Sequence, residues 1–129
     1  MKLVTARVGA ILYIIWGLLH IMAASAIYEL ALTTESDIQG RLFQSAWNLM
    51  YLAIMVIVVA IIFNWRQKRV GYWLTLFTVS ISDIGFILFI LVPGYLSWWP
   101  GVIGPLLWIA AALISTVSLN RGSEASVSV

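Results

Sequence analysis

Apolar residues dominate four stretches of this sequence, and short polar segments separate them. The stretches run from Val8 to Leu30, Gln44 to Asn64, Val70 to Pro93 and Gly101 to Leu119. A helix needs about 20 such residues to cross a hydrocarbon core of roughly 30 Å. The pattern predicts an all-α membrane protein, a four-transmembrane-helix up-down bundle.

The polar segments divide the chain into one transmembrane domain, residues 1–119, and a polar cytoplasmic tail, residues 120–129. The first linker, Ala31–Phe43, is acidic, and the second, Trp65–Arg69, is basic. The third, Gly94–Pro100, is rich in aromatic residues. Linkers this short leave no room for a soluble domain between the spans.

Charge predicts the orientation of the bundle. The side that holds both chain ends and the second linker carries most of the basic residues: Lys2, Arg7, Arg66, Lys68, Arg69 and Arg121. The other side carries Glu35 and Asp37 with only Arg41. Basic residues favour the cytoplasmic side, so we expect both termini to be cytoplasmic, in a bacterial-type inner (plasma) membrane.

Composition supports a membrane location. The chain is 63% hydrophobic and 9% charged, whereas soluble domains carry about 25% charged residues. The pI near 9.2 comes from cations at helix ends rather than from a basic surface, so we expect no nucleic-acid partner. An alternative is that residues 1–26 form a cleaved signal peptide, but their apolar run exceeds the usual length of about 7–15 residues.

Three ionisable residues fall within the spans: His20, Glu29 and Asp83. At about 1.5 Å per residue, His20 lies roughly 18 Å from the start of its span and Asp83 roughly 20 Å from the start of its own. Both spans start on the same side, so the two side chains should meet near the midplane. Glu29 should lie at the outer interface, on the face of its helix opposite His20.

The expected His20–Asp83 pair has three interpretations. It can be a hydrogen bond that only holds helices together, or a catalytic acid–base pair that handles protons. The third is His20 as a metal or haem ligand, which a single histidine and the absence of cysteine disfavour. We therefore expect neither a metal nor another cofactor.

Six further residues are candidates for binding a ligand. Four form a polar and aromatic stripe on the second span, and two tryptophans lie near the depth of the pair: Gln44, Trp47, Asn48, Tyr51, Trp16 and Trp108. A polar stripe should face the bundle rather than lipid. Together these residues predict an intramembrane pocket for a hydrophobic small molecule.

Three functions are compatible with such a pocket. The first is an acid–base enzyme of isomerase or cyclase type, or a binding protein, acting on a hydrophobic molecule. The second is an assembly subunit of a larger membrane complex, and the third is a small proton-coupled exporter, which we expect to be a homodimer. In composition alone the chain is similar to the EXPERA-domain sterol isomerases, which place His, carboxylates, Asn and Trp in a four-helix core; no signature of that family is matched.

Overall fold

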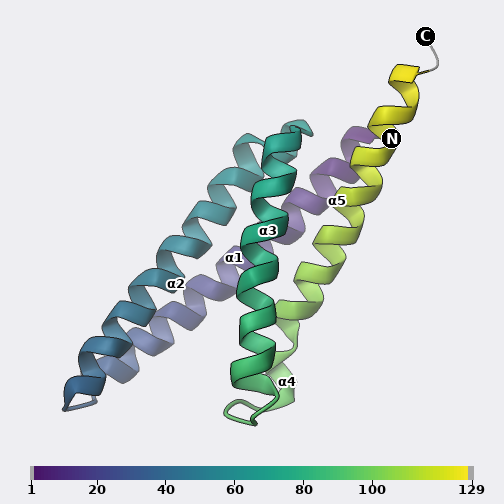
Figure 1. The fold of residues 1–129 in the computed structure, drawn as a ribbon. Helices are drawn as coiled ribbons and strands as arrows, with labels where there is room; N and C mark the ends of the chain where they lie inside the picture. The colour runs from purple at the N-terminus through teal and green to yellow at the C-terminus, as the bar shows by residue number, and fades with distance from the viewer. Residues whose placement is uncertain (1, 128–129) are drawn as a thin grey trace.

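Four long helices form the protein in the computed structural model, which describes residues 2–127 and the side chains of residues 3–120 (Figure 1). They are α1 (Lys2–Leu32), α2 (Asp37–Ile62), α3 (Arg69–Phe86) and α5 (Ile103–Val127). All four are long and apolar enough to cross a membrane. The prediction of four transmembrane helices is confirmed, and the chain is a multi-pass membrane protein. The side chains of Lys2 and Arg121, used to predict orientation, lie outside the described ones.

Short irregular elements join the long helices. A 3-10 helix, η1 (Asn64–Arg66), lies between α2 and α3. A π-helix, η2 (Ile87–Leu91), extends α3, and the short helix α4 (Trp98–Gly101) precedes α5. The loop between η2 and α4 turns at Gly94, whose φ of 80° favours glycine.

The helices extend beyond the apolar stretches. α2 begins at Asp37 rather than at Gln44, because the Ser36 side chain accepts a hydrogen bond from the Ile38 amide and Asp37 adds an acid to the first turn. Most of the acidic linker is therefore helical. α5 likewise continues to Val127, beyond the expected end of its span at Leu119.

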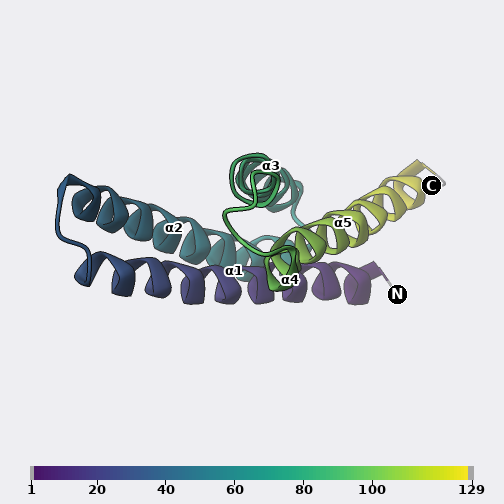
Figure 2. The ribbon, with the colours of Figure 1, turned by 90° about the horizontal axis from the view of Figure 1, so that it is seen from below.

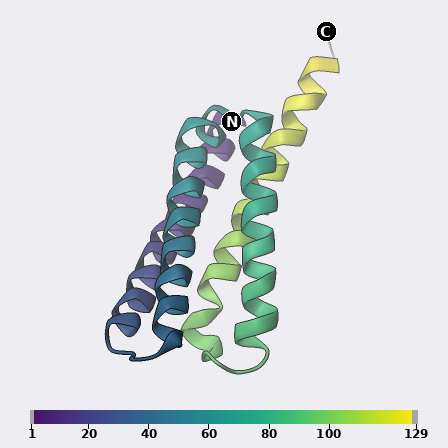
Figure 3. The ribbon, with the colours of Figure 1, turned by 60° about the vertical axis from the view of Figure 1, so that its left-hand side comes forward.

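The helices run alternately up and down. Figure 3 shows both chain ends and η1 at one end of the bundle, with the α1–α2 turn and the α4 loop at the other. We call these the inner and outer ends. Viewed nearly along α3, α1 runs across the opposite side of the bundle, with α2 and α5 extending to either side between them (Figure 2). The backbone contacts agree, since α1 and α3 each pack against α2 and α5.

The closest helix pair is α1 with α2, and small residues line its contact. Buried small residues recur every seven positions on both helices: Ala10, Gly17, Ala24 and Ala31 on α1, and Ala46, Ala53 and Ala60 on α2. The Gln39 amide donates to the Ala31 carbonyl at 3.0 Å, and a Cβ on Gly17 would lie 3.1 Å from the Ala53 carbonyl oxygen. Small side chains thus let two antiparallel backbones approach closely.

Larger buried residues fill the centre of the bundle. Tyr13 and Trp16 of α1 pack with Val56 of α2, Val79 of α3 and Ala111 of α5. Large apolar side chains such as Met22, Ile81 and Phe89 are instead exposed to the surroundings of the bundle. This outward apolar surface is what a lipid environment covers.

The outer parts of α1 and α2 diverge from the rest of the bundle. Figures 1 and 2 both show this hairpin extending away from α3 and α4. The outer halves of α1 and α2 therefore pack on each other and leave their other faces uncovered.

Candidate functional site

Asp83 lies at the centre of the bundle because it belongs to the buried face of α3. The buried residues of that helix recur every fourth position, at Gly71, Thr75, Val79 and Asp83. This spacing places them along one stripe. The Asp83 carboxyl is fully buried, with 0% of its surface exposed. Such a group needs partners, because an unpaired charge in an apolar interior is costly.

One partner of Asp83 is Trp16 of α1. The Trp16 Nε1–H donates to Asp83 Oδ2 at 2.9 Å, and Trp16 is also fully buried. The bond crosses the diagonal of the bundle, where only large side chains can join α1 to α3. Trp16, a predicted ligand-binding residue, therefore binds the carboxylate directly.

His20 is the other residue facing Asp83. Its Nε2 lies 3.9 Å from Asp83 Oδ1, and 13% of the His20 side chain is exposed. The prediction that these two residues lie close together is confirmed. The distance exceeds a hydrogen bond by about 1 Å, so a small side-chain movement would bring the atoms into contact.

The other nitrogen of His20 is held by its own helix. Nδ1 lies 2.8 Å from the Trp16 carbonyl oxygen, and the His20 ring stacks on the Trp16 ring with centroids 3.7 Å apart. A carbonyl oxygen can only accept, so Nδ1 carries a proton. The Trp16 carbonyl, rather than Asp83, therefore fixes the tautomer of His20.

These contacts leave one position for a proton between the pair. Asp83 Oδ1 is buried and has no hydrogen-bond partner among the described residues, while Oδ2 is occupied by Trp16. With Nδ1 protonated, a neutral His20 presents a lone pair at Nε2. A proton can therefore reside on Oδ1 or on Nε2, which makes the pair chemically capable of acid–base exchange.

Trp108 of α5 lies near the pair, and its hydrogen bond goes to a neighbouring residue of α3. Its Nε1–H donates to Ser80 Oγ at 2.9 Å, on the α3 turn before Asp83. Gly104 of α5 faces the histidine, since a Cβ there would lie 3.3 Å from His20 Cε1. Helices α3 and α5 are thus tied together beside the site.

The predicted ligand-binding stripe of α2 does not reach this centre. Gln44, Trp47, Asn48 and Tyr51 are all exposed, with Trp47 73% and Tyr51 65% exposed. The expectation that they face the bundle interior is wrong, because α2 turns its small residues toward α1. The prediction assumed that the polar residues of α2 face the bundle interior. Close packing of its small residues against α1 determines the buried face instead.

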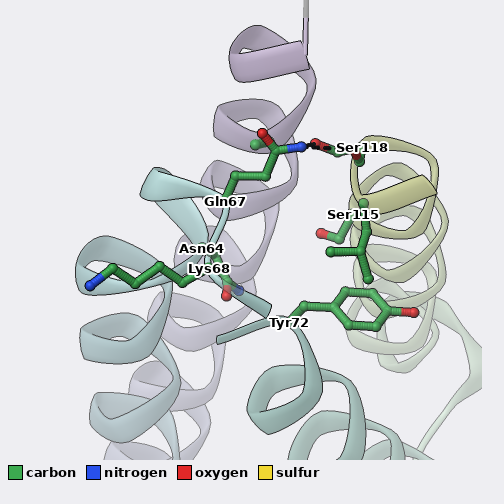
Figure 4. A pocket seen from close by; sticks show the side chains of 8 residues that line it. Asn64, Gln67, Lys68, Tyr72, Ser115 and Ser118 are labelled. Atoms are coloured by element: carbon green, nitrogen blue, oxygen red, sulfur yellow. Dashed lines mark hydrogen bonds between the residues drawn. The ribbon is translucent and has the colours of Figure 1, made fainter. Parts of the chain in front are cut away.

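A second polar cluster, unpredicted as a site, lies at the inner end (Figure 4). The Asn64 amide donates to Thr75 Oγ1 at 3.0 Å, and the Gln67 amide donates to the Ser118 carbonyl at 2.7 Å. Asn64, Gln67 and Ser118 line a cavity of about 20 Å³, the size of one water molecule. The other residues of its lining are Ala6, Lys68, Tyr72, Ser115 and Leu119. The sequence does contain hydroxyl and amide residues near three helix ends. Such residues commonly form ordinary interhelical hydrogen bonds, so they did not point to a site.

Comparison with known proteins gives no further guide to the site. No protein-family model, curated protein or solved structure matches this chain. The functional argument therefore rests on the geometry.

Proposed function

We propose that this chain is a membrane protein that exchanges a proton through the His20–Asp83 pair, acting on a hydrophobic small molecule. The observation that carries the proposal is the unpaired Asp83 Oδ1, which faces His20 Nε2 at 3.9 Å. The indole donors of Trp16 and Trp108 both have acceptors, whereas Asp83 Oδ1, like Tyr13 Oη and Asn64 Oδ1, is buried without a hydrogen-bond partner among the described residues. Of these three oxygens, Asp83 Oδ1 is the one that faces an imidazole. A buried carboxylate oxygen left open beside an imidazole supports a chemical role.

The pair can add and remove protons on a molecule that reaches it from the bilayer. Asp83 with a proton on Oδ1 is an acid, and neutral His20 is a base at Nε2. The fixed Nδ1 proton means that Nε2 is the nitrogen that gains or loses a proton. Isomerisation or cyclisation would use this exchange on the bound molecule, whereas an exporter would use it to drive transport.

Infrared spectroscopy of the protein in lipid tests whether the pair exchanges protons with water. The carboxyl stretch of protonated Asp83 separates from that of the carboxylate, and we expect this band to change with bulk pH and to shift in D2O. Asp83→Asn should remove the band, since an amide cannot ionise. Glu29→Gln is the control, because it removes a carboxyl at the outer surface only.

A band that changes neither with bulk pH nor in D2O would show that the pair does not exchange protons with water. That result would contradict the proposal. His20→Gln should then leave the band unchanged, as expected of a pair that only joins α1 to α3. In the proton-exchange account, His20→Gln changes the pH at which the band appears.

A second candidate function, an assembly subunit, is favoured by the exposed Asn48. Asn48 lies about 22 Å from Phe63 along α2, inside a hydrocarbon core of roughly 30 Å. Its side chain is exposed and forms no hydrogen bond within residues 3–120. An amide in lipid gains from a partner helix, so a second membrane chain, or a second copy of this one, would satisfy it.

Native mass spectrometry from membranes tests the assembly function. We expect a complex that Asn48→Leu weakens, while Ile54→Leu, a control on the exposed apolar face of the same helix, leaves it intact. A monomeric chain in native membranes would contradict this second function.

A further inference from the structure

An open hollow lies between the outer parts of α1 and α2, away from the His20–Asp83 pair. Its volume is about 650 Å³, within the range of small-molecule sites. Aromatic rings from both helices line it, namely Tyr28, Phe43 and Trp47, together with the carboxylate of Glu29. The other lining residues are apolar or small, with Ser25 as one hydroxyl. We call this hollow the outer groove.

Glu29 gives the outer groove a negative charge. Its side chain is exposed, and it forms no ion pair within the described side chains, residues 3–120. No lysine or arginine lines the groove. Glu29 lies about 33 Å from Arg7 along α1, so it sits at the outer boundary of the hydrocarbon core. A carboxylate at that boundary, beside an apolar hollow, attracts a cation that is itself apolar.

The aromatic rings add a second attraction for a cation. The Tyr28 and Phe43 rings lie 5.2 Å apart at an angle of 56°, so rings from the two helices adjoin beside the groove. Trp47 is 73% exposed and borders the same hollow. Aromatic faces attract organic cations through the ring quadrupole, and tryptophan does so most strongly.

We propose that the outer groove binds a hydrophobic organic monocation, such as a quaternary ammonium or phosphonium, dissolved at the outer membrane interface. Glu29 supplies the counter-charge, Tyr28, Phe43 and Trp47 supply the ring faces, and the small residues of the α1–α2 contact leave the space. A zwitterionic phospholipid fits less well, because its phosphate would lie beside Glu29 with no basic partner in the lining. The proposal does not depend on proton exchange at His20 and Asp83.

Equilibrium dialysis of tetraphenylphosphonium against the purified chain in dodecyl maltoside micelles tests the proposal. This detergent has no charge and no amine that could compete. We expect saturable binding, one cation per chain. Glu29→Gln and Trp47→Leu should each lower the affinity about three- to tenfold, the size of one charge or ring contact at a partly exposed site.

Glu35→Gln is the matched control, because Glu35 is an exposed outer carboxylate that does not line the groove. It should change the affinity less than twofold. The changed side chains are exposed, so the variants should fold, which their melting temperatures confirm.

Three results would overturn the proposal. The first is unsaturable partition of the cation into wild-type micelles, and the second is an equal loss in Glu29→Gln and Glu35→Gln. The third is displacement of the cation by added phosphatidylcholine or phosphatidylethanolamine, which would assign the groove to a lipid headgroup.

Discussion

At the scale of single residues, the buried Asp83 carboxyl carries the highest cost of desolvation. A carboxyl with no exposed surface, in the middle of a membrane helix, is stable only with partners. Trp16 donates a hydrogen bond to Oδ2 of the carboxyl, and His20 Nε2 lies 3.9 Å from Oδ1. The bond from Trp16 therefore positions the carboxyl and leaves Oδ1 facing the imidazole.

Removing the Trp16 donor should destabilise the protein. Trp16→Phe keeps an aromatic ring but removes the Nε1–H, so a second buried carboxyl oxygen loses its partner. We expect a loss of about 1–3 kcal/mol in the free energy of unfolding. Reversible unfolding in mixed micelles measures it.

Trp108→Phe is the matched control for this prediction. It also removes one indole donor, but its acceptor is a neutral hydroxyl, Ser80 Oγ. Its loss should be smaller, close to the roughly 0.6 kcal/mol typical of interhelical hydrogen bonds in membranes. Equal losses in the two variants would show that the carboxylate has no special need of Trp16.

The pairing of His20 with Asp83 was predictable because depth in a membrane follows directly from residue counting. The hydrogen bond from Trp16 to Asp83 was not predictable. Trp16 precedes His20 by one helical turn, so the sequence alone does not say which of the two side chains faces Asp83. The stacked rings resolve this, because they let both side chains reach the same carboxyl. Depth identifies which residues are level, whereas side-chain packing decides which atoms meet.

At the scale of helices, the α1–α2 contact determines which residues face the membrane. Small residues every seven positions bring the two helices together and leave the bulkier residues on the outer faces. The exposed positions of Trp47, Asn48 and Tyr51 follow from this choice. Both the second candidate function and the outer groove depend on this contact.

A methyl group added at the α1–α2 contact should weaken it. In Gly17→Ala the new Cβ would lie 2.5 Å from Ile57 Cγ1 and 3.1 Å from the Ala53 carbonyl oxygen. We expect a loss of about 1–3 kcal/mol in stability, as for other overpacked sites. The free energy of unfolding in mixed micelles is the measurement.

Gly85→Ala is the control, because no atom lies within 4 Å of a Cβ built there. It should be neutral or slightly stabilising, since alanine favours a helix more than glycine does. A Gly17→Ala variant as stable as Gly85→Ala would show that the two backbones are not in close contact.

The number of helices was predictable from sequence, but their ends and faces were not. Apolar length predicts a span because the hydrocarbon core has a fixed thickness. Helix ends depend on local capping, such as that of Ser36, which is independent of hydropathy. The inward face of α2 depends on how its small residues fit against those of α1. It can therefore be predicted only when the sequences of both helices are considered together.

At the scale of the whole molecule, the arrangement of the helices explains why the site lies where it does. Helices α1 and α3 lie on opposite sides of the bundle, each packed against α2 and α5 (Figure 2). His20, Trp16 and Asp83 span the space between α1 and α3.

Orientation is a further prediction at this scale. The chain has no native cysteine, so single cysteines can be introduced cleanly. A thiol reagent that cannot cross the membrane should react from outside with Gln39→Cys and not with Arg66→Cys. Labelling from outside at residue 66 but not at residue 39 would place both chain ends outside and contradict the charge argument.

Nitrogen NMR of the protein in lipid tests the central claim most directly, because His20 is the one histidine and a labelled histidine reports it alone. The account predicts that Nδ1 carries a proton, and that Nε2 is the nitrogen whose signal changes with pH. It also predicts a different Nε2 signal in Asp83→Asn. A neutral ring protonated at Nε2 with Nδ1 bare, or an Nε2 signal unchanged by Asp83→Asn, would contradict proton exchange between the two residues.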